Sequence, residues 1–274
     1  MRRVIATPLF VLMIAPAALA QSNDFHWSGQ IQRGKAIEVK GVNGSVRAEF
    51  TSGNQVEVTG VKTARRSDLN SVSVQVVQED GNVTVCAVYP TPDRSRYSRS
   101  RSRSGRDYEP NECRPGSAGH MNVDDNDVRV DFTVKIPASV KFFGKTVNGN
   151  IDAMALRADA AVETVNGEIT LETTGTGSAV TVNGSIDASM GVSTWTEPLE
   201  FRTVNGSITL RLPKDVNANV HAGMMNGGFQ SDFPLMVQSF GGRNRHVDGT
   251  IGKGGRDLDL HTVNGRIHLQ SVPQ

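Results

Sequence analysis

The sequence is poor in aromatic side chains, in cysteine and in net charge. Aromatic residues make up 5% of the chain, which leaves few of the flat platforms on which sugars or bases stack. The 29 basic residues nearly balance the 28 acidic residues, so bulk charge predicts neither a nucleic-acid nor a membrane partner. No convincing amphipathic helical pattern longer than two turns is present beyond residue 20, which disfavours helical folds.

Long hydrophobic runs are also missing, except near the N-terminus. Arg2 and Arg3 precede an apolar stretch at residues 4–15, and Ala18-Leu19-Ala20 offers a small-x-small cleavage site. This pattern predicts a secretory signal peptide over residues 1–20, because the stretch is too short to span a membrane. We therefore expect a soluble exported protein, periplasmic or extracellular, with no membrane span.

Cys86 and Cys113 are the two cysteines in the sequence. An even number of cysteines in an exported chain predicts a disulfide between them. In the chain-entropy model, closing this loop adds roughly 3–4 kcal/mol to the free energy of unfolding. No Cys-x-x-Cys redox motif is present. The pair is therefore interpreted as structural.

The sequence does contain a repeated Asn-Gly dipeptide, nearly always preceded by Val. From Asn148 onward the copies follow one another at steps of 18, 17, 22, 21, 22 and 16 residues, with Val247-Asp248-Gly249 interpreted as one of them. A period near 20 residues with one turn per period predicts stacked units. The structural turn residues are Asn43, Gly44, Asn148, Gly149, Asn166, Gly167, Asn183, Gly184, Asn205, Gly206, Asn226, Gly227, Asn264 and Gly265.

The aligned units read Thr-Val-Asn-Gly-x-Ile. We expect the β-branched Val and Ile to point inward and Thr to point outward beside the corner. Gly is expected to supply a positive φ, and the Asn amides to stack over one another about 4.8 Å apart. The predicted fold is all-β: a right-handed β-helix-like or β-roll-like β-solenoid over residues 138–274, preceded by irregular strands over residues 21–137. Isolated hairpins of a sandwich are the alternative.

Residues 93–107 alternate Ser and Arg and contain almost nothing apolar, which predicts a disordered loop. Guanidinium groups suit phosphate and sulfate, so this loop could bind anionic polysaccharide, lipopolysaccharide phosphate or DNA. A solvated insertion with no ligand is the alternative. The candidate anion-binding residues are Arg94, Arg96, Arg99, Arg101, Arg103 and Arg106.

Candidate catalytic and metal-binding groups are weak. Asp152 and Asp187 occupy equivalent positions two units apart, which places their backbones about 9–10 Å from each other. This separation is near the upper limit for the carboxylate pair of an inverting glycosidase, but no third acid or nearby Arg lies in register with them. The polar run 124–127 lacks the Gly and distal Glu of a calcium loop, and the six histidines show no zinc-binding spacing. The sequence thus predicts no catalytic, metal or cofactor-binding residue.

Three features together resemble a known family. They are the Thr-Val-Asn-Gly-x-Ile units, the segment 212–235 with Ser231-Asp232-Phe233-Pro234, and Gly252-Lys253-Gly254-Gly255 before the unit at 261–265. Residues 35–272 resemble a bacterial domain-of-unknown-function family of β-strand-repeat proteins often labelled "putative adhesin". The resemblance implies a β-helix-like solenoid at the cell envelope and no established activity.

The functional hypothesis is a non-enzymatic exported envelope protein that serves as an adhesin-like or binding scaffold. Its expected partner is anionic polysaccharide or another envelope component, and its oligomeric state stays open. A carbohydrate-active β-helix enzyme and a purely structural periplasmic protein are the alternatives.

Overall fold

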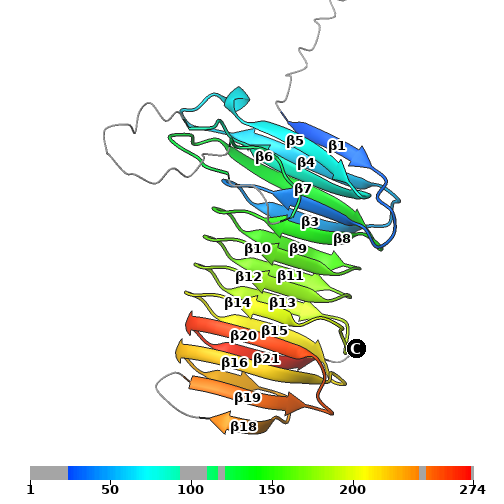
Figure 1. Cartoon of the computed structure of the whole chain (residues 1–274), viewed down its shortest axis with the longest axis vertical. Coiled ribbons are helices and arrows are strands. Elements are labelled where there is room, and N and C mark those ends of the chain that lie inside the picture. The colour runs from blue at the N-terminus through cyan, green and yellow to red at the C-terminus, as the bar shows by residue number, and fades with distance from the viewer. Residues whose placement is uncertain (1–23, 93–109, 117–120, 241–244, 273–274) are drawn as a thin grey trace, which may run out of the picture.

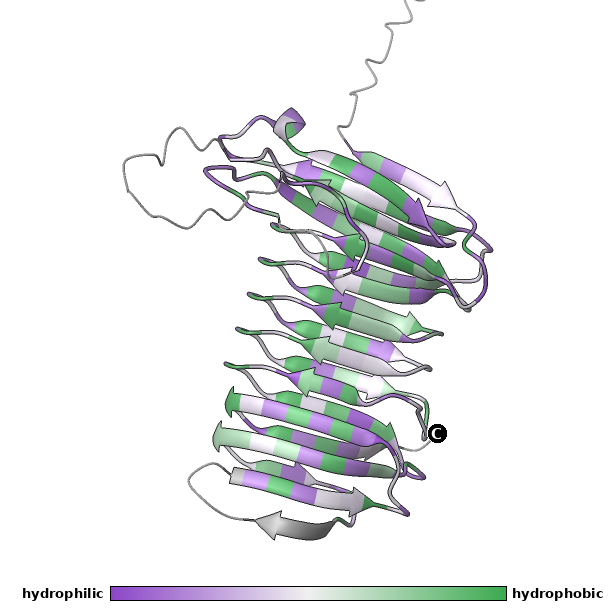
Figure 2. Ribbon diagram, viewed as in Figure 1, coloured by the Kyte–Doolittle hydropathy of each residue, from purple (hydrophilic) through white to green (hydrophobic). Residues whose placement is uncertain are grey.

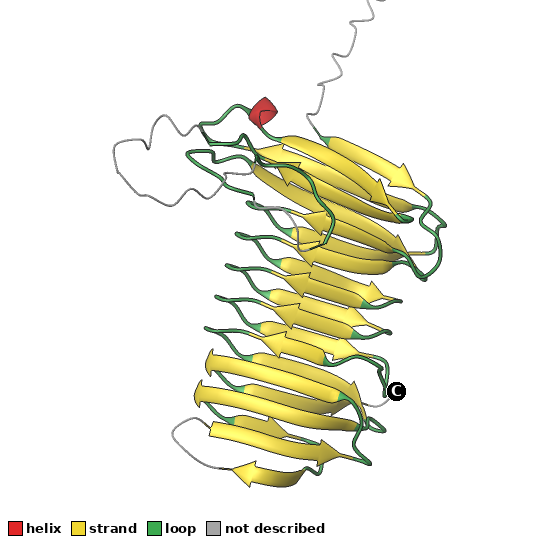
Figure 3. Cartoon of the chain, in the orientation of Figure 1, coloured by secondary structure: helices red, strands yellow, loops and turns green. Residues whose placement is uncertain are grey.

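The computed structural model describes residues 24–92, 110–116, 121–240 and 245–272. Every strand in it belongs to one of two large sheets, which lie face to face in an elongated stack (Figure 1). Within the described residues the one helical element is a 3₁₀ turn, η1 (Leu69–Ser71), visible in Figure 3 beside the strands. The prediction of an all-β fold is confirmed.

Both sheets run along the stack, with strands crossing its long axis. The ten-stranded sheet has the order β1 (Phe25–Gly29), β4 (Val56–Thr63), β7 (Arg129–Pro137), β3 (Val46–Thr51), β9 (Ile151–Leu156), β11 (Ile169–Thr173), β13 (Ile186–Met190), β15 (Ile208–Pro213), β21 (Ile267–Val272) and β17 (Phe229–Ser231). The eleven-stranded sheet has the order β18 (Met236–Phe240), β19 (Arg245–Ile251), β16 (Ala218–Asn226), β20 (Asp257–Asn264), β14 (Leu199–Arg202), β12 (Gly177–Val180), β10 (Ala160–Glu163), β8 (Lys141–Lys145), β2 (Ala36–Lys40), β6 (Asn82–Val88) and β5 (Ser73–Glu79).

In the middle of the stack the chain alternates between the sheets. Each rung consists of a strand of the eleven-stranded sheet, an Asn-Gly corner, and a strand of the ten-stranded sheet: β8 leads to β9, β10 to β11, β12 to β13, and β14 to β15. Neighbouring rungs are parallel and in register, so Ile169 lies between Ile151 and Ile186. β2 and β3 extend the same pattern, since Ile37 pairs with Phe142 and Val46 with Ile151.

The order of rungs in space departs from their order in the sequence. β20 and β21 lie against β14 and β15, and β16 and β17 lie on their far side. The unit at residues 257–272 is therefore inserted between two units that precede it in the chain. Interpreting Val247-Asp248-Gly249 as a further corner is wrong, because these residues lie inside β19, paired antiparallel with β16.

Antiparallel strands cover both ends of the stack. At one end β4 and β7 pair antiparallel in the ten-stranded sheet, and the β5–β6 hairpin closes the other sheet. The hairpin turns at Asp80 and Gly81, whose φ values of 49° and 79° fit a mirror-image two-residue turn. At the other end β19 and β18 continue the eleven-stranded sheet antiparallel. These strands shield three of the four sheet ends from pairing with other chains, and the ten-stranded sheet ends instead on the three-residue parallel strand β17.

The core fills the space between the sheets. Hydrophobic and hydrophilic residues alternate along the strands in Figure 2, because successive side chains of a strand point to opposite faces. Five of the strands that follow a corner begin with an inward Ile that is at most 1% exposed: Ile151, Ile169, Ile186, Ile208 and Ile267.

Replacing Ile186 by Ala will lower the free energy of unfolding by about 2–5 kcal/mol, because Ile186 is 1% exposed and its loss leaves a cavity between rungs. Val182→Ala is the matched control: Val182 lies in the same rung, is 37% exposed, and its truncation should change stability by about 0.5 kcal/mol or less. Urea denaturation measures both. Equal losses would contradict the assignment of inward and outward positions.

Candidate functional site

Seven corner asparagines form a column along one side of the stack. From the second asparagine of the column onward, each side-chain amide nitrogen donates to the side-chain oxygen of the asparagine before it, at 2.8–2.9 Å. The column begins beside Tyr89, whose buried hydroxyl donates to the Val128 carbonyl at 2.7 Å. Burial raises the pKa of Tyr89, and hydrogen bonds from Asn43 oppose that rise. In spatial order the column contains Asn43, Asn148, Asn166, Asn183, Asn205, Asn264 and Asn226.

The corner glycines are required by close approach between rungs. A Cβ on Gly167 would overlap the carbonyl oxygen of Gly149, and a Cβ on Gly184 would overlap that of Gly167. Only Gly44 among the corner glycines has a positive φ, at 133°. The expectation that Gly supplies a left-handed turn is therefore wrong at the other corners. There Gly is required because the backbone of the neighbouring rung leaves no room for a Cβ.

The threonines before the corners point inward, so the expectation of an outward Thr column is wrong. Each hydroxyl donates to the corner glycine carbonyl of the neighbouring rung at 2.8–3.1 Å. This bond gives the glycine carbonyl a hydrogen-bond donor at the corner, where the chain turns out of the sheet. All five are at most 5% exposed: Thr146, Thr164, Thr181, Thr203 and Thr262.

The valines that follow these threonines point outward. Val147, Val165 and Val182 are 36–38% exposed, and Met225 in the equivalent position is 53% exposed. The expectation that this Val points inward is wrong, because Thr occupies the inward position and side chains alternate. We call the residues in this position the Val column; its other members are Val204 and Val263, which are half-buried, and Val42, which is buried at 7% exposure.

A furrow runs beside the Val column. On each rung the last outward residue of the eleven-stranded sheet forms one wall, the Thr backbone forms the floor, and the Val column forms the other wall. Two cavities of about 430 and 370 Å³ lie in this furrow. Together the two cavities border seven corners, and at about 4.8 Å per rung these corners extend over roughly 30 Å. The first wall contains Lys40, Lys145, Glu163, Val180, Arg202, His261 and Gly223.

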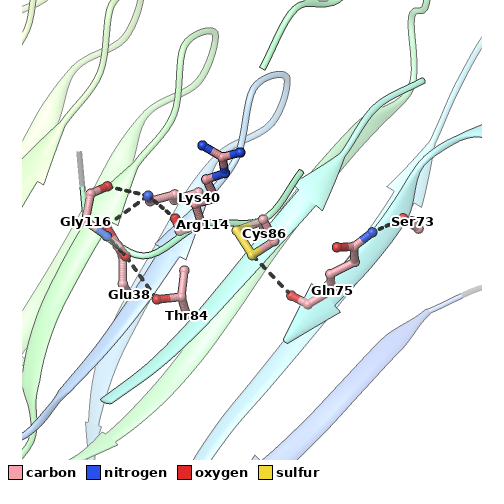
Figure 4. The surroundings of a disulfide bond; sticks show 9 residues. Glu38, Lys40, Ser73, Gln75, Thr84, Cys86, Arg114 and Gly116 are labelled. Carbon is pink, nitrogen blue, oxygen red and sulfur yellow. Dashed lines mark hydrogen bonds and ion pairs between the residues drawn. A yellow bond between two sulfur atoms is a disulfide. The ribbon is translucent and has the colours of Figure 1, made fainter. Parts of the chain in front are cut away.

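A strap at residues 110–116 overhangs the first cavity. Its Cys113 is bonded to Cys86 of β6, so the predicted disulfide is present, with 5.5 Å between the two Cα atoms. Lys40 Nζ donates to the carbonyls of Arg114, at 2.6 Å, and Gly116 (Figure 4). The Gly116 backbone N–H donates to Glu38 Oε2 at 2.9 Å.

Glu38 and Lys40 lie beneath the strap, and the sequence did not single them out. Their charged groups lie 3.4 Å apart, and their side chains are only 9% and 17% exposed. The alternating pattern of β2 places both on the outer face of the sheet, where exposure is the ordinary expectation. They are covered because the strap crosses that face, and only the position of Cys113 in the sequence hints at this.

The remaining sequence candidates do not form a reactive site among the described residues. Asp152 lies 4.0 Å from Arg47, and Asp187 is held by both terminal nitrogens of Arg211. Thr170 lies between the two aspartates in the sheet, so the two carboxylates are bound in separate ion pairs. The six arginines of the Ser/Arg segment 93–107 lie outside the described residues.

The acidic run 124–127 organises a loop. Asp127 accepts hydrogen bonds from the backbone N–H groups of Arg66 and Ser67, at 3.1 and 2.9 Å. Hydrogen bonds from Ser67 lower the pKa of Asp127 to about 2. Across the parts of the chain that the structure describes, no three His, Cys, Asp or Glu side chains come together as a metal site.

Two histidines contact one carboxylate at the far end of the stack. His221 Nδ1 and His246 Nε2 each lie 2.8 Å from Asp248. The hydrogen bond to Asp248 raises the pKa of His221 and lowers the pKa of Asp248. Because Asp248 belongs to β19 and His221 to β16, this pair holds the covering strand to the rungs.

These observations define a class: an all-β protein built of repeated rungs, with an elongated surface furrow beside its corners. The Toastrack DUF4097 family model matches residues 20–270, and the chain belongs to this family. The predicted resemblance to a domain-of-unknown-function family is thereby confirmed. No described helix is long and apolar enough to cross a membrane.

Solved structures show limited similarity, and no curated protein matches the chain. A putative cell adhesion protein from Clostridium sporogenes is 10% identical over 91% of this chain and 100% of its own, with a TM-score of 0.42. A putative adhesin from Bacteroides fragilis is 9% identical over 92% of this chain and 98% of its own, with a TM-score of 0.33. Likeness at this level carries no conclusion about function.

Thr164→Val will lower the free energy of unfolding by about 1–3 kcal/mol. The variant keeps the shape of the side chain but removes the hydroxyl that donates to the Gly149 carbonyl at 2.9 Å. Thr170→Val on the outward face of β11 is the control and should leave stability unchanged. Chemical denaturation distinguishes the two, and an unchanged Thr164→Val variant would show that the corner bond does not stabilise the stack.

Asp248→Asn will destabilise the protein more at about pH 5.5 than at about pH 8.5. A raised His221 pKa contributes stability that is complete below its ordinary value near 6.5 and disappears as the pH rises through the raised value. Asp152→Asn is the control, because its partner Arg47 stays charged throughout. Urea denaturation at both pH values measures the difference, and equal effects at both would contradict the assignment.

Proposed function

We propose that this chain is a β-solenoid that serves as a non-enzymatic, adhesin-like binding scaffold of the cell envelope. The observation that carries the proposal is the furrow, which extends over seven stacked corners and has one wall of outward apolar side chains. A rigid surface of this length suits a linear partner that makes many shallow contacts, since each rung adds a similar contact to the next.

Export supports the same conclusion. The proposed signal peptide at residues 1–20 would deliver the chain to an oxidising compartment, where the Cys86–Cys113 disulfide is stable. The disulfide and the Lys40–Glu38 pair hold the strap over one end of the furrow. The furrow therefore keeps its shape without a bound ligand, which reduces the entropy that binding must overcome.

The furrow predicts that Val165→Lys will weaken binding to an envelope polysaccharide, with lipopolysaccharide and polygalacturonate as the probes. Val165 is 38% exposed, so the substitution should leave the fold intact while it breaks the apolar wall. Thr170→Lys on the outer face of the other sheet adds the same charge and is the control. Biolayer interferometry on the full chain should show about tenfold weaker binding for Val165→Lys only.

Loss of binding only after removal of residues 93–107 would move the site to the Ser/Arg segment. Binding to neither polymer would favour the purely structural role.

A further inference from the structure

The second cavity of the furrow differs from the first in its chemistry. It has a volume of about 370 Å³ and lies over β14, β20, β16 and β19. Arg202, His261 and His246 line one side, and Val204, Val263 and Met225 form the apolar wall opposite. Among the described residues, no acidic side chain lines this cavity.

The absence of a side chain on Gly223 allows the His261 ring to lie across β16 beside this cavity. Gly223 of β16 pairs with His261 on one side and with His246 on the other. A Cβ on Gly223 would lie 2.6 Å from His261 Nδ1, so the His261 ring leans over the glycine. His261 and His246 on the two neighbouring strands, and Arg202 one strand beyond His261, thus surround the part of the cavity beside Gly223. We call this part of the cavity the gap.

The donors around this gap are only partly neutralised. Arg202 lies 3.9 Å from Glu200, and both side chains are about half exposed, so solvent screens this pair. His246 contacts Asp248 through Nε2. The described residues supply no side-chain hydrogen bond or ion pair to His261. A guanidinium beside imidazole N–H groups favours a carboxylate, sulfate or phosphate group.

The floor of the furrow offers no backbone edge to which a peptide strand could add. The Asn264 N–H donates to the Val204 carbonyl at 2.8 Å, the Gly265 N–H to the Asn226 carbonyl at 2.9 Å, and the Thr203 N–H to the His261 carbonyl at 2.9 Å. Strand addition needs such groups unpaired. A partner here must be recognised by side chains, through apolar faces against the Val column and an anionic group at the gap.

We propose that the gap at Gly223 is an anion-binding subsite for an acidic polysaccharide that lies lengthwise in the furrow. This inference rests on the proposed function and adds to it the class of ligand and the residues that bind the ligand's anionic groups. Arg202 and His261 bind the anionic substituent of one sugar unit, while Val204, Val263 and Met225 contact the apolar faces of neighbouring units.

The test measures binding of the full chain to polygalacturonate, dextran sulfate and uncharged dextran. The first two probes distinguish carboxylate from sulfate as the preferred anion. The double variant Arg202→Gln/His261→Gln should bind the preferred acidic polymer about tenfold or more weakly, the effect of losing one or two charged hydrogen bonds. Gly223→Ala should weaken binding similarly, because the added Cβ would lie 2.6 Å from His261 Nδ1 and displace that ring.

Arg47→Gln is the control, because Arg47 is a 65% exposed guanidinium on the other sheet. Circular dichroism and thermal unfolding verify that each variant keeps the wild-type fold. Unchanged binding by Arg202→Gln/His261→Gln, or equal weakening by Arg47→Gln, would overturn the subsite and leave the scaffold function standing. Equal binding of uncharged dextran would overturn it as well. Failure of the wild-type chain to bind any of these polymers or lipopolysaccharide would overturn both proposals.

Discussion

The stack depends on the contact between one corner glycine and the rung beside it. The Gly149 carbonyl accepts the Thr164 hydroxyl at 2.9 Å, and the same carbonyl approaches Gly167 so closely that no Cβ fits. Any shift of one rung against the next by a single residue would bring a side chain into that space and turn the inward Ile outward. The corner therefore fixes the register, and the register in turn produces the Asn column and the straight outer wall of the furrow.

Much of the fold is predictable from the sequence, because the corner signal repeats and short strands join the copies. The side-chain directions at the corner are harder to predict, because Val and Ile are equally apolar. The hydrogen bond that Thr makes decides that Thr points inward and Val points outward. The position of β20 between β14 and β16 also escapes prediction, because every copy of the corner offers the same pairing surface. The register within a pair of strands therefore does not predict which two rungs lie next to each other.

The candidate site is less predictable than the fold. A furrow arises from one residue per rung, spaced many positions apart, and none of these residues belongs to a recognisable motif. Gly223 is an example: in the sequence it is one of 28 glycines, and its role follows only from its pairing with His261 and His246. The strap shows the same limit, since Glu38 and Lys40 become covered only when a distant segment crosses their sheet.

The insertion of residues 257–272 between two earlier rungs has a consequence for folding. A stack whose rungs follow sequence order can grow from one end, one rung after another. Here β16 and β17 have no parallel neighbour until β20 and β21 arrive to fill the slot between them and β14 and β15. Pairing across that slot raises the contact order and delays closure of this half of the molecule. The same insertion then interlocks the end of the stack, because β20 pairs with β14 on one side and with β16 on the other and cannot leave without breaking both pairings.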